Sequence, residues 1–388
     1  MVRLKDLILD QDTAKRVPTG SGEFDRVLGG GMVPGSVILV AGEPGIGKST
    51  LLTQLALKVG VHHGGPVLYV CGEESPNQVG LRIKRLSNIQ NQNILMLATT
   101  DVDDVVEAAQ GEKPDLMIVD SIQTMTTGDL VGMAGSVGQV RECTNRLISY
   151  AKTQEVPIFL VGHVTKEGSV AGPKVLEHMV DCVLSLEGEK TGLWRILRAY
   201  KNRFGPADEV GVFTMDESGL TDVPNPSGAF LEESQAGQPG SATAVVMEGT
   251  RPVLLEVQAL TVPTTLPIPR RIAQGFPLAK IQLMVAILTK HCRLPLSDKD
   301  VFVNVAGGLK VTEPAADLAL ALAIASSAVG KALPKGSVAI GEVGLLGEIR
   351  RVNFLSRRVK EAKALGFKQT ITPETQPYVR QVVRSLLA

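Results

Sequence analysis

A glycine-rich segment of this chain has the residue types and spacing that bind phosphate. It fits the pattern GxxxxGK[ST] and follows an apolar run, residues 37–40, that predicts a buried strand. The glycines let successive backbone N–H groups converge on an anion, while a lysine adds positive charge and a serine hydroxyl can bind Mg²⁺. We therefore predict a site for a nucleoside triphosphate and Mg²⁺ in this P-loop, which comprises Gly42, Glu43, Pro44, Gly45, Ile46, Gly47, Lys48, Ser49 and Thr50.

Acidic residues that follow two other apolar runs could complete a hydrolytic site. Asp120 ends the run 116–119, where its carboxylate could hold the water shell of a metal ion opposite Ser49. Glu73 and Glu74 follow the run 67–70, where one of them could be the general base for the attacking water, and we favour Glu73. The alternatives are an Asp that caps the next segment and a solvated acidic loop.

These residues need a sheet that brings the ends of several strands to one edge. In the first two hundred residues, apolar runs alternate with helical patterns, which predicts a mostly parallel sheet covered on both faces. Closely spaced strand patterns follow, as in antiparallel hairpins. The predicted parallel strands are 37–40, 67–70, 94–97, 116–119 and 158–161, the helices are 50–57, 102–109 and 140–153, and the hairpin strands are 182–186, 194–199 and 212–215.

With 388 residues, the chain is long enough for two domains. The sequence Pro-Asn-Pro-Ser at 224–227 suits neither a helix nor a strand and is a plausible boundary. Beyond it lie strand patterns at 242–247 and 253–257 and helical patterns at 278–291 and 315–329. We therefore predict an α/β domain over residues 1–225 and an α+β domain over residues 226–388.

The composition excludes several classes of protein. Forty basic and forty acidic residues balance, so no global field favours a polyanionic partner, although a local basic patch is compatible with this balance. The four cysteines have neither zinc-ligand nor disulfide spacing, so we expect no zinc and a reducing cytoplasm. The start of the chain lacks the apolar core of a signal peptide, and the longest apolar stretch, 318–329, is shorter than the roughly 20 residues that span a bilayer. We expect no membrane contact.

Several motifs resemble a known family. Residues 17–20 and 24–31, together with the P-loop, resemble the RecA-like ATPase superfamily, and the sequence KNRFG at 201–205 is similar to the signature of the bacterial RadA (Sms) DNA-repair family. Residues 163–168 and 171–178 also resemble that family. The resemblance implies a RecA-like P-loop core followed by a Lon-protease-like domain. Members usually begin with a four-Cys zinc module, and this chain starts after its place, so the functions of that module are not carried over.

The resemblance implies a ring-shaped motor. It implies a homo-hexamer that hydrolyses ATP between neighbouring protomers, moves on single-stranded DNA and promotes branch migration, with a recombinase or a replicative helicase as a possible partner. In that arrangement Lys201 and Arg203 reach the γ-phosphate bound by the adjacent subunit, where cations supplied in trans neutralise developing charge. The alternative is that these two residues form a solvated basic turn.

Two segments are candidates for contact with DNA. Residues 124–138 are rich in small residues and directly follow the Asp120 strand, and a second loop lies at 164–174, after the next strand. Basic side chains and backbone N–H groups there could contact phosphates. The alternative is a plain surface connection. His163, beside these loops, could sense the nucleotide state or simply satisfy a local hydrogen bond. The candidate DNA-binding residues are Arg141, Lys166 and Lys174.

The C-terminal part resembles the proteolytic domain of Lon-type proteases at residues 301–308 and 341–348. In that pattern a nucleophilic Ser and a Lys base form the active site, but here Ala315 and Ser356 occupy their positions. Neither can fill the role, so we expect a proteolytically inactive scaffold. An excess of basic over acidic residues in 345–388 could hold branched DNA or form solvated helix surface. An ATP-dependent protease and an autophosphorylating switch are the competing functions.

Overall fold

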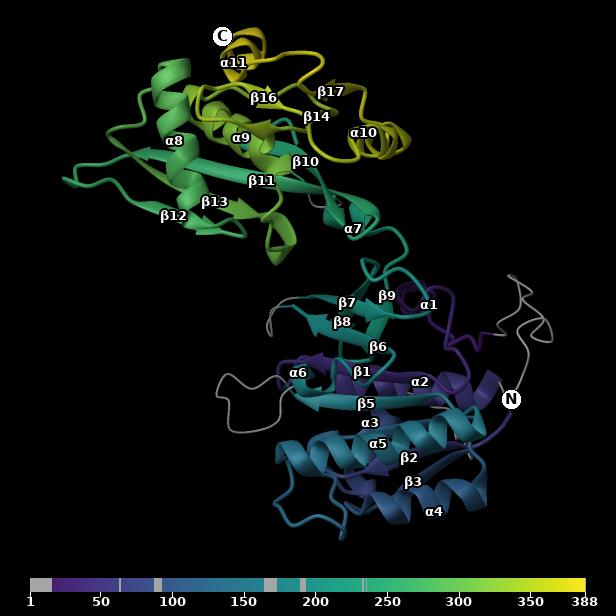
Figure 1. The fold of residues 1–388 in the computed structure, drawn as a ribbon. Coiled ribbons are helices and arrows are strands. Elements are labelled where there is room, and N and C mark those ends of the chain that lie inside the picture. Colours follow the sequence, from purple (N-terminus) through teal and green to yellow (C-terminus); the bar gives the residue numbers. More distant parts are fainter. Residues whose placement is uncertain are drawn as a thin grey trace. The chain divides into compact units, whose positions relative to one another are not determined.

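The structure is a computed structural model that describes residues 16–62, 64–86, 93–163, 173–188, 193–231, 234 and 236–387. It divides into two compact units, Met1–Pro224 and Asn225–Ala388 (Figure 1). Among the described residues, no helix combines the length and the apolar character needed to span a bilayer.

Unit 1 is built on one large sheet with the strand order β3-β2-β4-β5-β1-β6-β7-β8-β9. The pairs from β3 to β6 are parallel, and β6 to β9 form antiparallel hairpins. The strands are β1 Val37–Gly42, β2 Val67–Cys71, β3 Ile94–Leu97, β4 Leu116–Asp120, β5 Ile158–His163, β6 Cys182–Glu187, β7 Trp194–Asn202, β8 Val210–Asp216 and β9 Gly219–Asp222. The helices are α1 Gly22–Leu28, α2 Lys48–His62, α3 Pro76–Leu86, α4 Val102–Glu112, α5 Val137–Gln154 and α6 Pro173–Leu176, with a 3₁₀ turn at Ile122–Thr124.

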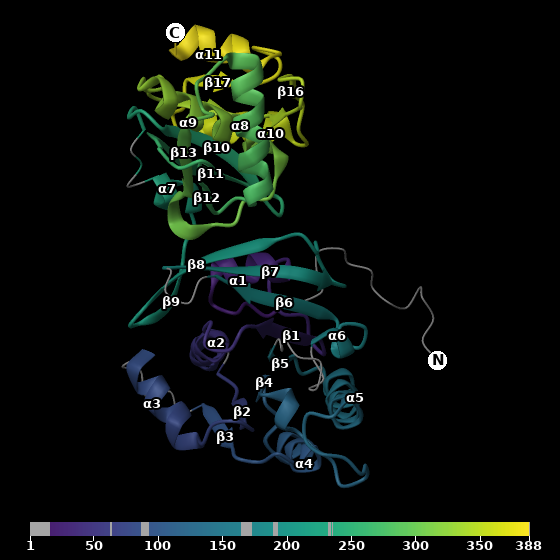
Figure 2. The same ribbon diagram turned by 90° about the vertical axis from the view of Figure 1, so that its left-hand side faces the viewer.

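Helices cover both faces of the parallel strands. Figure 2 shows α2 and α3 on one side of these strands and α4 and α5 on the other. Successive strand residues point to opposite faces, so Ile38 and Val40 pack with the α2 side while Val37 and Leu39 pack with the α5 side. Because both faces are buried, β1 is a continuous apolar run without polar alternation.

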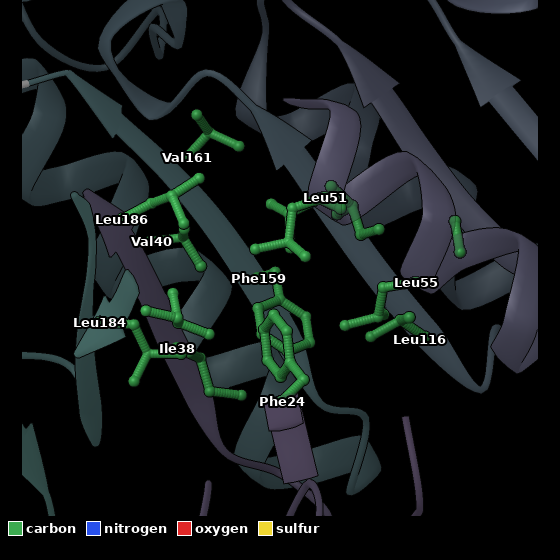
Figure 3. Close-up of a cluster of buried hydrophobic side chains, with 14 of the residues drawn as sticks. Phe24, Ile38, Val40, Leu51, Leu55, Leu116, Phe159, Val161, Leu184 and Leu186 are labelled. Atoms are coloured by element: carbon green, nitrogen blue, oxygen red, sulfur yellow. The ribbon is translucent and has the colours of Figure 1, made fainter. Parts of the chain in front are cut away.

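The core on the α2 side surrounds an aromatic pair (Figure 3). Phe24 of α1 and Phe159 of β5 are fully buried, with ring centroids 5.7 Å apart and an interplanar angle of 79°. This edge-to-face geometry is favourable for aromatic rings. Leu51 and Leu55 of α2 pack in the same cluster, so the helix that follows the P-loop is fixed to the sheet.

Unit 2 is an α+β unit with a mixed sheet of order β12-β13-β11-β10-β14-β17 and a small β15-β16 ribbon. Its central helix α9 is apolar all round because it is buried on all sides. The strands are β10 Ser241–Glu248, β11 Arg251–Pro263, β12 Arg271–Gln274, β13 Lys299–Val305, β14 Ser337–Ala339, β15 Glu342–Val343, β16 Ile349–Arg350 and β17 Gln369–Ile371. The helices are α7 Pro226–Leu231, α8 Leu278–Cys292, α9 Asp317–Val329, α10 Leu355–Ala364 and α11 Val379–Leu387, with 3₁₀ turns at Ala306–Gly308 and Pro314–Ala316.

The predicted fold class is confirmed, since a mostly parallel α/β sheet with antiparallel hairpins at one edge precedes an α+β unit. The segment 224–227 was expected to continue neither kind of element. β9 ends at Asp222, before this segment, and Pro226 then opens a new helix, α7. A proline fits there because the first residues of a helix have no intrahelical partner for their N–H groups.

Candidate nucleotide-binding site

The P-loop connects β1 to α2, as the sequence predicts. Lys48 is the first residue of α2 and is 4% exposed, and its Nζ donates to the carbonyl oxygens of Gly42 at 3.0 Å and Glu43 at 3.1 Å. The amine therefore reaches back over the loop to its first two residues. The N-terminus of α2 lies at the same place and favours negative charge.

The glycine backbone of the loop fits a phosphate cradle. Gly42, Gly45 and Gly47 have φ values of 157°, 79° and 114°, which other residues rarely adopt. A Cβ at Gly42 would lie 2.7 Å from the carbonyl oxygen of Leu186, whereas one at Gly45 would meet no atom within 4 Å. The loop is thus packed against the sheet on one side and open on the other, where a phosphate would be bound.

Asp120 ends β4 beside the P-loop, at the position expected for a metal-binding carboxylate. It is 5% exposed, its Oδ2 accepts a hydrogen bond from the hydroxyl of Tyr69 at 2.9 Å, and the Ser49 hydroxyl is near enough to oppose the rise in its pKa. Oxygen donors of this kind suit Mg²⁺. The Ser49 hydroxyl and the Asp120 carboxylate therefore fit a magnesium site.

The two glutamates after β2 have different surroundings. The N–H groups of Gly72 and Glu73 donate to the carbonyl oxygen of Asp120 at 2.8 and 3.1 Å, which fixes the end of β2 beside the end of β4. The carboxylate of Glu73 is half exposed and contacts Nε2 of His163, the last residue of β5, at 2.9 Å. Glu74 instead pairs with Arg82 of α3. The geometry thus distinguishes a glutamate at the site from one bound to the neighbouring helix.

Burial acts on both charged groups at the centre of the site. Desolvation lowers the pKa of Lys48, although the negative charges of Asp120 and Glu73 oppose this shift. Desolvation also raises the pKa of Asp120, against the hydrogen bonds from Ser49 and Tyr69. The protein therefore holds two ionisable groups where water stabilises their charges poorly, as is common at functional sites.

Lys201 and Arg203 lie toward the amino-terminal end of β1, whereas the P-loop follows its carboxyl end. Lys201 pairs with Val183 of β6, and Val183 pairs with Leu39 of β1. The P-loop begins three residues further along β1, at Gly42, which is about 10 Å of strand. Because β7 runs antiparallel to β6, its last residues lead away from that end. A single copy therefore holds these two cations away from its own P-loop.

Contacts within the same copy fix both cations. Lys201 Nζ donates to the carbonyl oxygens of Glu177 at 2.6 Å and Val180 at 2.8 Å. Arg203 is half exposed and pairs at 3.0 Å with Asp181, whose other carboxylate oxygen accepts from the N–H of Val37 at 3.1 Å. These residues are therefore an ordered part of the surface, in contrast to a solvated basic turn.

The KNRFG loop packs against the glycine-rich end of α1. Asn202 Nδ2 donates to the carbonyl oxygen of Leu28 at 3.2 Å. A Cβ at Gly205 would lie 3.3 Å from the Cα of Gly29, which is tighter than most such contacts, so glycine favours this close approach of two backbones. Two motifs far apart in the sequence therefore form one surface feature.

The predicted DNA-contacting segment after β4 is an exposed loop with a fixed base. Gln139 is 2% exposed and donates to the carbonyl oxygens of Thr127 at 3.2 Å and Leu130 at 2.8 Å. Val131 and Met133 at the loop tip are almost fully exposed. The fixed base presents the tip to solvent.

The three predicted DNA-binding residues have different outcomes. Arg141 lies exposed in the first turns of α5, as expected. Lys174 lies exposed in α6, which corrects the expectation that the loop extends to this residue. Pro173 explains the helix, because a proline is favourable in a first turn. Lys166 lies outside the described residues.

Unit 2 has no dyad at the two positions compared with Lon-type proteases. Ala315 is fully buried in a 3₁₀ turn, and Ser356 is exposed on α10. Nearby, the fully buried Arg358 of α10 pairs with Glu313 and donates to the carbonyl oxygen of Val245 at 2.8 Å. Arg358 therefore does not belong to the basic surface that the composition of this segment suggests.

Sequence reasoning missed three residues that position the site. The Tyr69 hydroxyl donates to Asp120, and Arg82 pairs with Glu74. Arg195 of β7 is 3% exposed and donates to the P-loop carbonyl of Ile46 at 3.0 Å. Of these three residues, only Arg195 could have been noticed in the sequence, because it is an Arg within an apolar strand pattern. Charged residues are seldom fully buried unless they are bound to a partner.

Comparisons with known proteins show which family this chain resembles. A family model described as an AAA domain matches residues 22–169, and one described as subunit ChlI of Mg-chelatase matches residues 279–376. Over 358 residues the chain is 52% identical to DNA repair protein RadA of Bacillus subtilis (strain 168), an alignment that covers 92% of this chain and 78% of that protein. Over 366 residues it is 50% identical to DNA repair protein RadA of Aquifex aeolicus (strain VF5), covering 94% and 82%.

Among solved structures, a KaiC-like protein from the archaeon Pyrococcus horikoshii OT3 aligns with a TM-score of 0.45 and 20% identity, over 54% of this chain and 99% of its own. The relatives that are about half identical span both units of the chain. This chain belongs to the RadA family of DNA repair ATPases.

Proposed function

We propose that this chain is an ATP-hydrolysing DNA motor that works as a ring of six copies on single-stranded and branched DNA. The observation that carries the proposal is the position of Lys201 and Arg203, which are held by contacts within their own copy and lie toward the end of the strands remote from its P-loop. Cations held in this way can complete a nucleotide site only in a neighbouring copy.

Within one copy, the P-loop residues bind the phosphates. Lys48 contributes positive charge, and Ser49 and Asp120 would hold Mg²⁺, which when bound neutralises charge on the phosphate oxygens. Glu73 accepts a proton from the attacking water, because its carboxylate is accessible beside Asp120. Glu74 has a structural role, as its pairing with Arg82 indicates.

Between copies, Lys201 and Arg203 stabilise the charge that develops on the transferred phosphoryl group. Such cations supplied in trans accelerate hydrolysis by about 10³- to 10⁵-fold in other nucleotide hydrolases. Hydrolysis at each boundary then depends on how two copies fit together, and this dependence couples turnover to motion of the subunits.

On the DNA side, the loop after β4 and the segment after His163 contact the strand, with Arg141, Lys166 and Lys174 as phosphate ligands. His163 lies between the candidate base Glu73 and the second of these segments. Strand binding can therefore change the position of Glu73 through His163. Unit 2 serves as a proteolytically inactive scaffold, because Ala315 offers no nucleophile.

Mixing two inactive variants tests this proposal. Lys48→Ala loses its own P-loop function but keeps its trans cations, and Arg203→Ala is the reverse. With random assembly, roughly one boundary in four pairs an intact P-loop with an intact cation, so the mixture should recover about a quarter of wild-type ATPase activity. Arg198→Ala, on the strand β7 that Arg203 directly follows, is the matched control.

Turnover that stays at the level of the separate variants, in rings shown to exchange subunits, would contradict shared sites. ATPase activity should also rise with single-stranded DNA, and no casein should be cleaved in the presence of ATP. Cleavage would support an ATP-dependent protease, and phosphate transferred to the chain from labelled ATP would support an autophosphorylating switch.

A further inference from the structure

Arg195 reaches the P-loop from the antiparallel part of the sheet. It is the second residue of β7, which is separated from β1 by β6, and only 3% of it is exposed. Its Nε donates to the carbonyl oxygen of Ile46 at 3.0 Å, and its Nη1 donates to that of Trp194 at 2.8 Å. One buried guanidinium thus joins β7 to the phosphate-binding loop.

This hydrogen bond fixes the orientation of one peptide group. The carbonyl of Ile46 and the N–H of Gly47 belong to the same peptide, and in a trans peptide they point in opposite directions. Arg195 holds the carbonyl of Ile46 on the sheet side of the loop. The N–H of Gly47 therefore points to the opposite side of the loop, which is the open one. Gly47 has a φ of 114°, so without this bond its backbone has other conformations available.

Burying a guanidinium is unfavourable, and an apolar residue on β7 would pack at less cost. The side chain of Ile46 is 1% exposed and anchors its own residue, so Arg195 is not needed merely to bury the loop. Its contact with the loop also sets the direction of a peptide dipole in the phosphate site.

The same strand continues to the cations that face the next copy. β7 carries Arg195 near its start and Lys201 near its end, and Arg203 follows immediately. β7 pairs with β8 from Trp194 to Arg198 and with β6 from Ile196 to Asn202, with one irregularity in the β6 register before Lys201, so strand pairing holds it from its first residue to its last. A movement of the Ile46–Gly47 peptide can therefore reach Lys201 and Arg203 through the hydrogen bond to Arg195 and then along the backbone of β7.

We propose that Arg195 is a positioning residue that aims the Gly47 N–H into the phosphate site, and that β7 thereby links the occupancy of one copy's P-loop to the cations offered to its neighbour. The first part concerns a single copy. The second part rests on the proposed function, because it needs shared sites.

Binding of a non-hydrolysable ATP analogue to Arg195→Met and Arg195→Lys tests the first part. Losing the aimed donor should raise the Kd of Arg195→Met about tenfold, and Arg195→Lys should recover much of the loss because its amine can still donate to Ile46. Arg198→Met, three residues further along β7, is the control and should bind as wild type. Thermal unfolding of each variant without nucleotide separates lost affinity from lost stability.

A folded Arg195→Met with wild-type Kd would overturn the proposal, and so would a Lys variant no better than Met. If Arg195→Met does not fold, the comparison of Arg195→Lys with wild type decides, since a shorter, less directional donor should still raise the Kd measurably. For the second part, the Hill coefficient for ATP should fall in Arg195→Lys. The mixed variants could fail to recover ATPase activity while the Arg195 variants raise the Kd as expected. That combination would refute the shared sites and leave the positioning role of Arg195 standing.

Discussion

His163 Nε2 lies 2.9 Å from Glu73 Oε2, and the two residues come from the ends of β5 and β2 at the same edge of the sheet. The contact ties the candidate general base to the residue from which the second predicted DNA-contacting segment starts. In the proposed function, hydrolysis of ATP and contact with DNA would therefore be linked through this one contact.

Glu73→Gln should lower the kcat for ATP hydrolysis by about 10²- to 10⁴-fold, because the amide cannot accept a proton from water. Nucleotide affinity should change little. Glu74→Gln is the matched control, since it alters the adjacent residue and weakens only the pair with Arg82. Steady-state ATPase assays and analogue binding decide this, and equal kcat losses in the two variants would contradict the assignment.

His163→Ala should separate basal turnover from stimulation by DNA. The variant frees Glu73 from its partner, so hydrolysis without DNA should persist, while the increase caused by single-stranded DNA should be largely lost. ATPase activity is measured over a range of DNA concentrations, with DNA affinity determined separately. Full stimulation at saturating DNA would show that the contact is a local hydrogen bond without a role in coupling.

Much of the ATPase core could be predicted from the sequence. Parallel strands buried on both faces are continuous apolar runs, so 37–40 and 116–119 could be recognised without any partner in view. The phosphate-binding pattern is equally easy to recognise, since GxxxxGK[ST] lies within the consecutive residues 42–49. The short strands of unit 2, such as Glu342–Val343, carry too few residues to show a period.

The rest of the site depends on contacts between distant residues. Glu73 and Glu74 are adjacent and chemically alike, and only the position of Arg82 on α3 shows which of them is engaged elsewhere. Arg195 lies 149 residues from Ile46, and the apolar pattern around it gives no indication of the loop that it contacts. Residues that position a site are therefore harder to predict than those that perform its chemistry.

Asp120→Asn should stabilise the nucleotide-free protein at neutral pH. Burial raises the pKa of Asp120 in the folded state, so the folded protein binds its proton more tightly than the unfolded chain. Stability from this group is greatest below the unfolded pKa and falls as pH rises through the folded pKa. Above the folded pKa the penalty of burying the charged carboxylate is complete, and the neutral amide of Asn removes it.

The thermal midpoint of Asp120→Asn should therefore exceed that of wild type at pH 7, and the difference should shrink toward pH 4. Loss of magnesium-dependent ATP hydrolysis should accompany the gain. Thermal unfolding without nucleotide at several pH values measures the first effect. An unchanged or lower midpoint at pH 7 would mean that the hydrogen bonds from Ser49 and Tyr69 outweigh desolvation.

Glu313→Gln should destabilise unit 2 without altering ATP hydrolysis. Arg358 is fully buried, and Glu313 supplies its charged partner while also accepting from the N–H of Met247 at 2.7 Å. Removing one partner of a buried pair leaves an uncompensated charge. Because 29% of the Glu313 side chain is exposed, we expect a loss of unfolding free energy of about 2 kcal/mol, which is less than the cost at a fully buried pair.

The control is Arg351→Met, which breaks an exposed pair with Glu374 and should cost less than ~1 kcal/mol. Chemical denaturation compares the two, and ATPase is assayed below the unfolding transition. If Glu313→Gln costs no more than Arg351→Met, the buried pair does not hold α10 to the sheet of this unit.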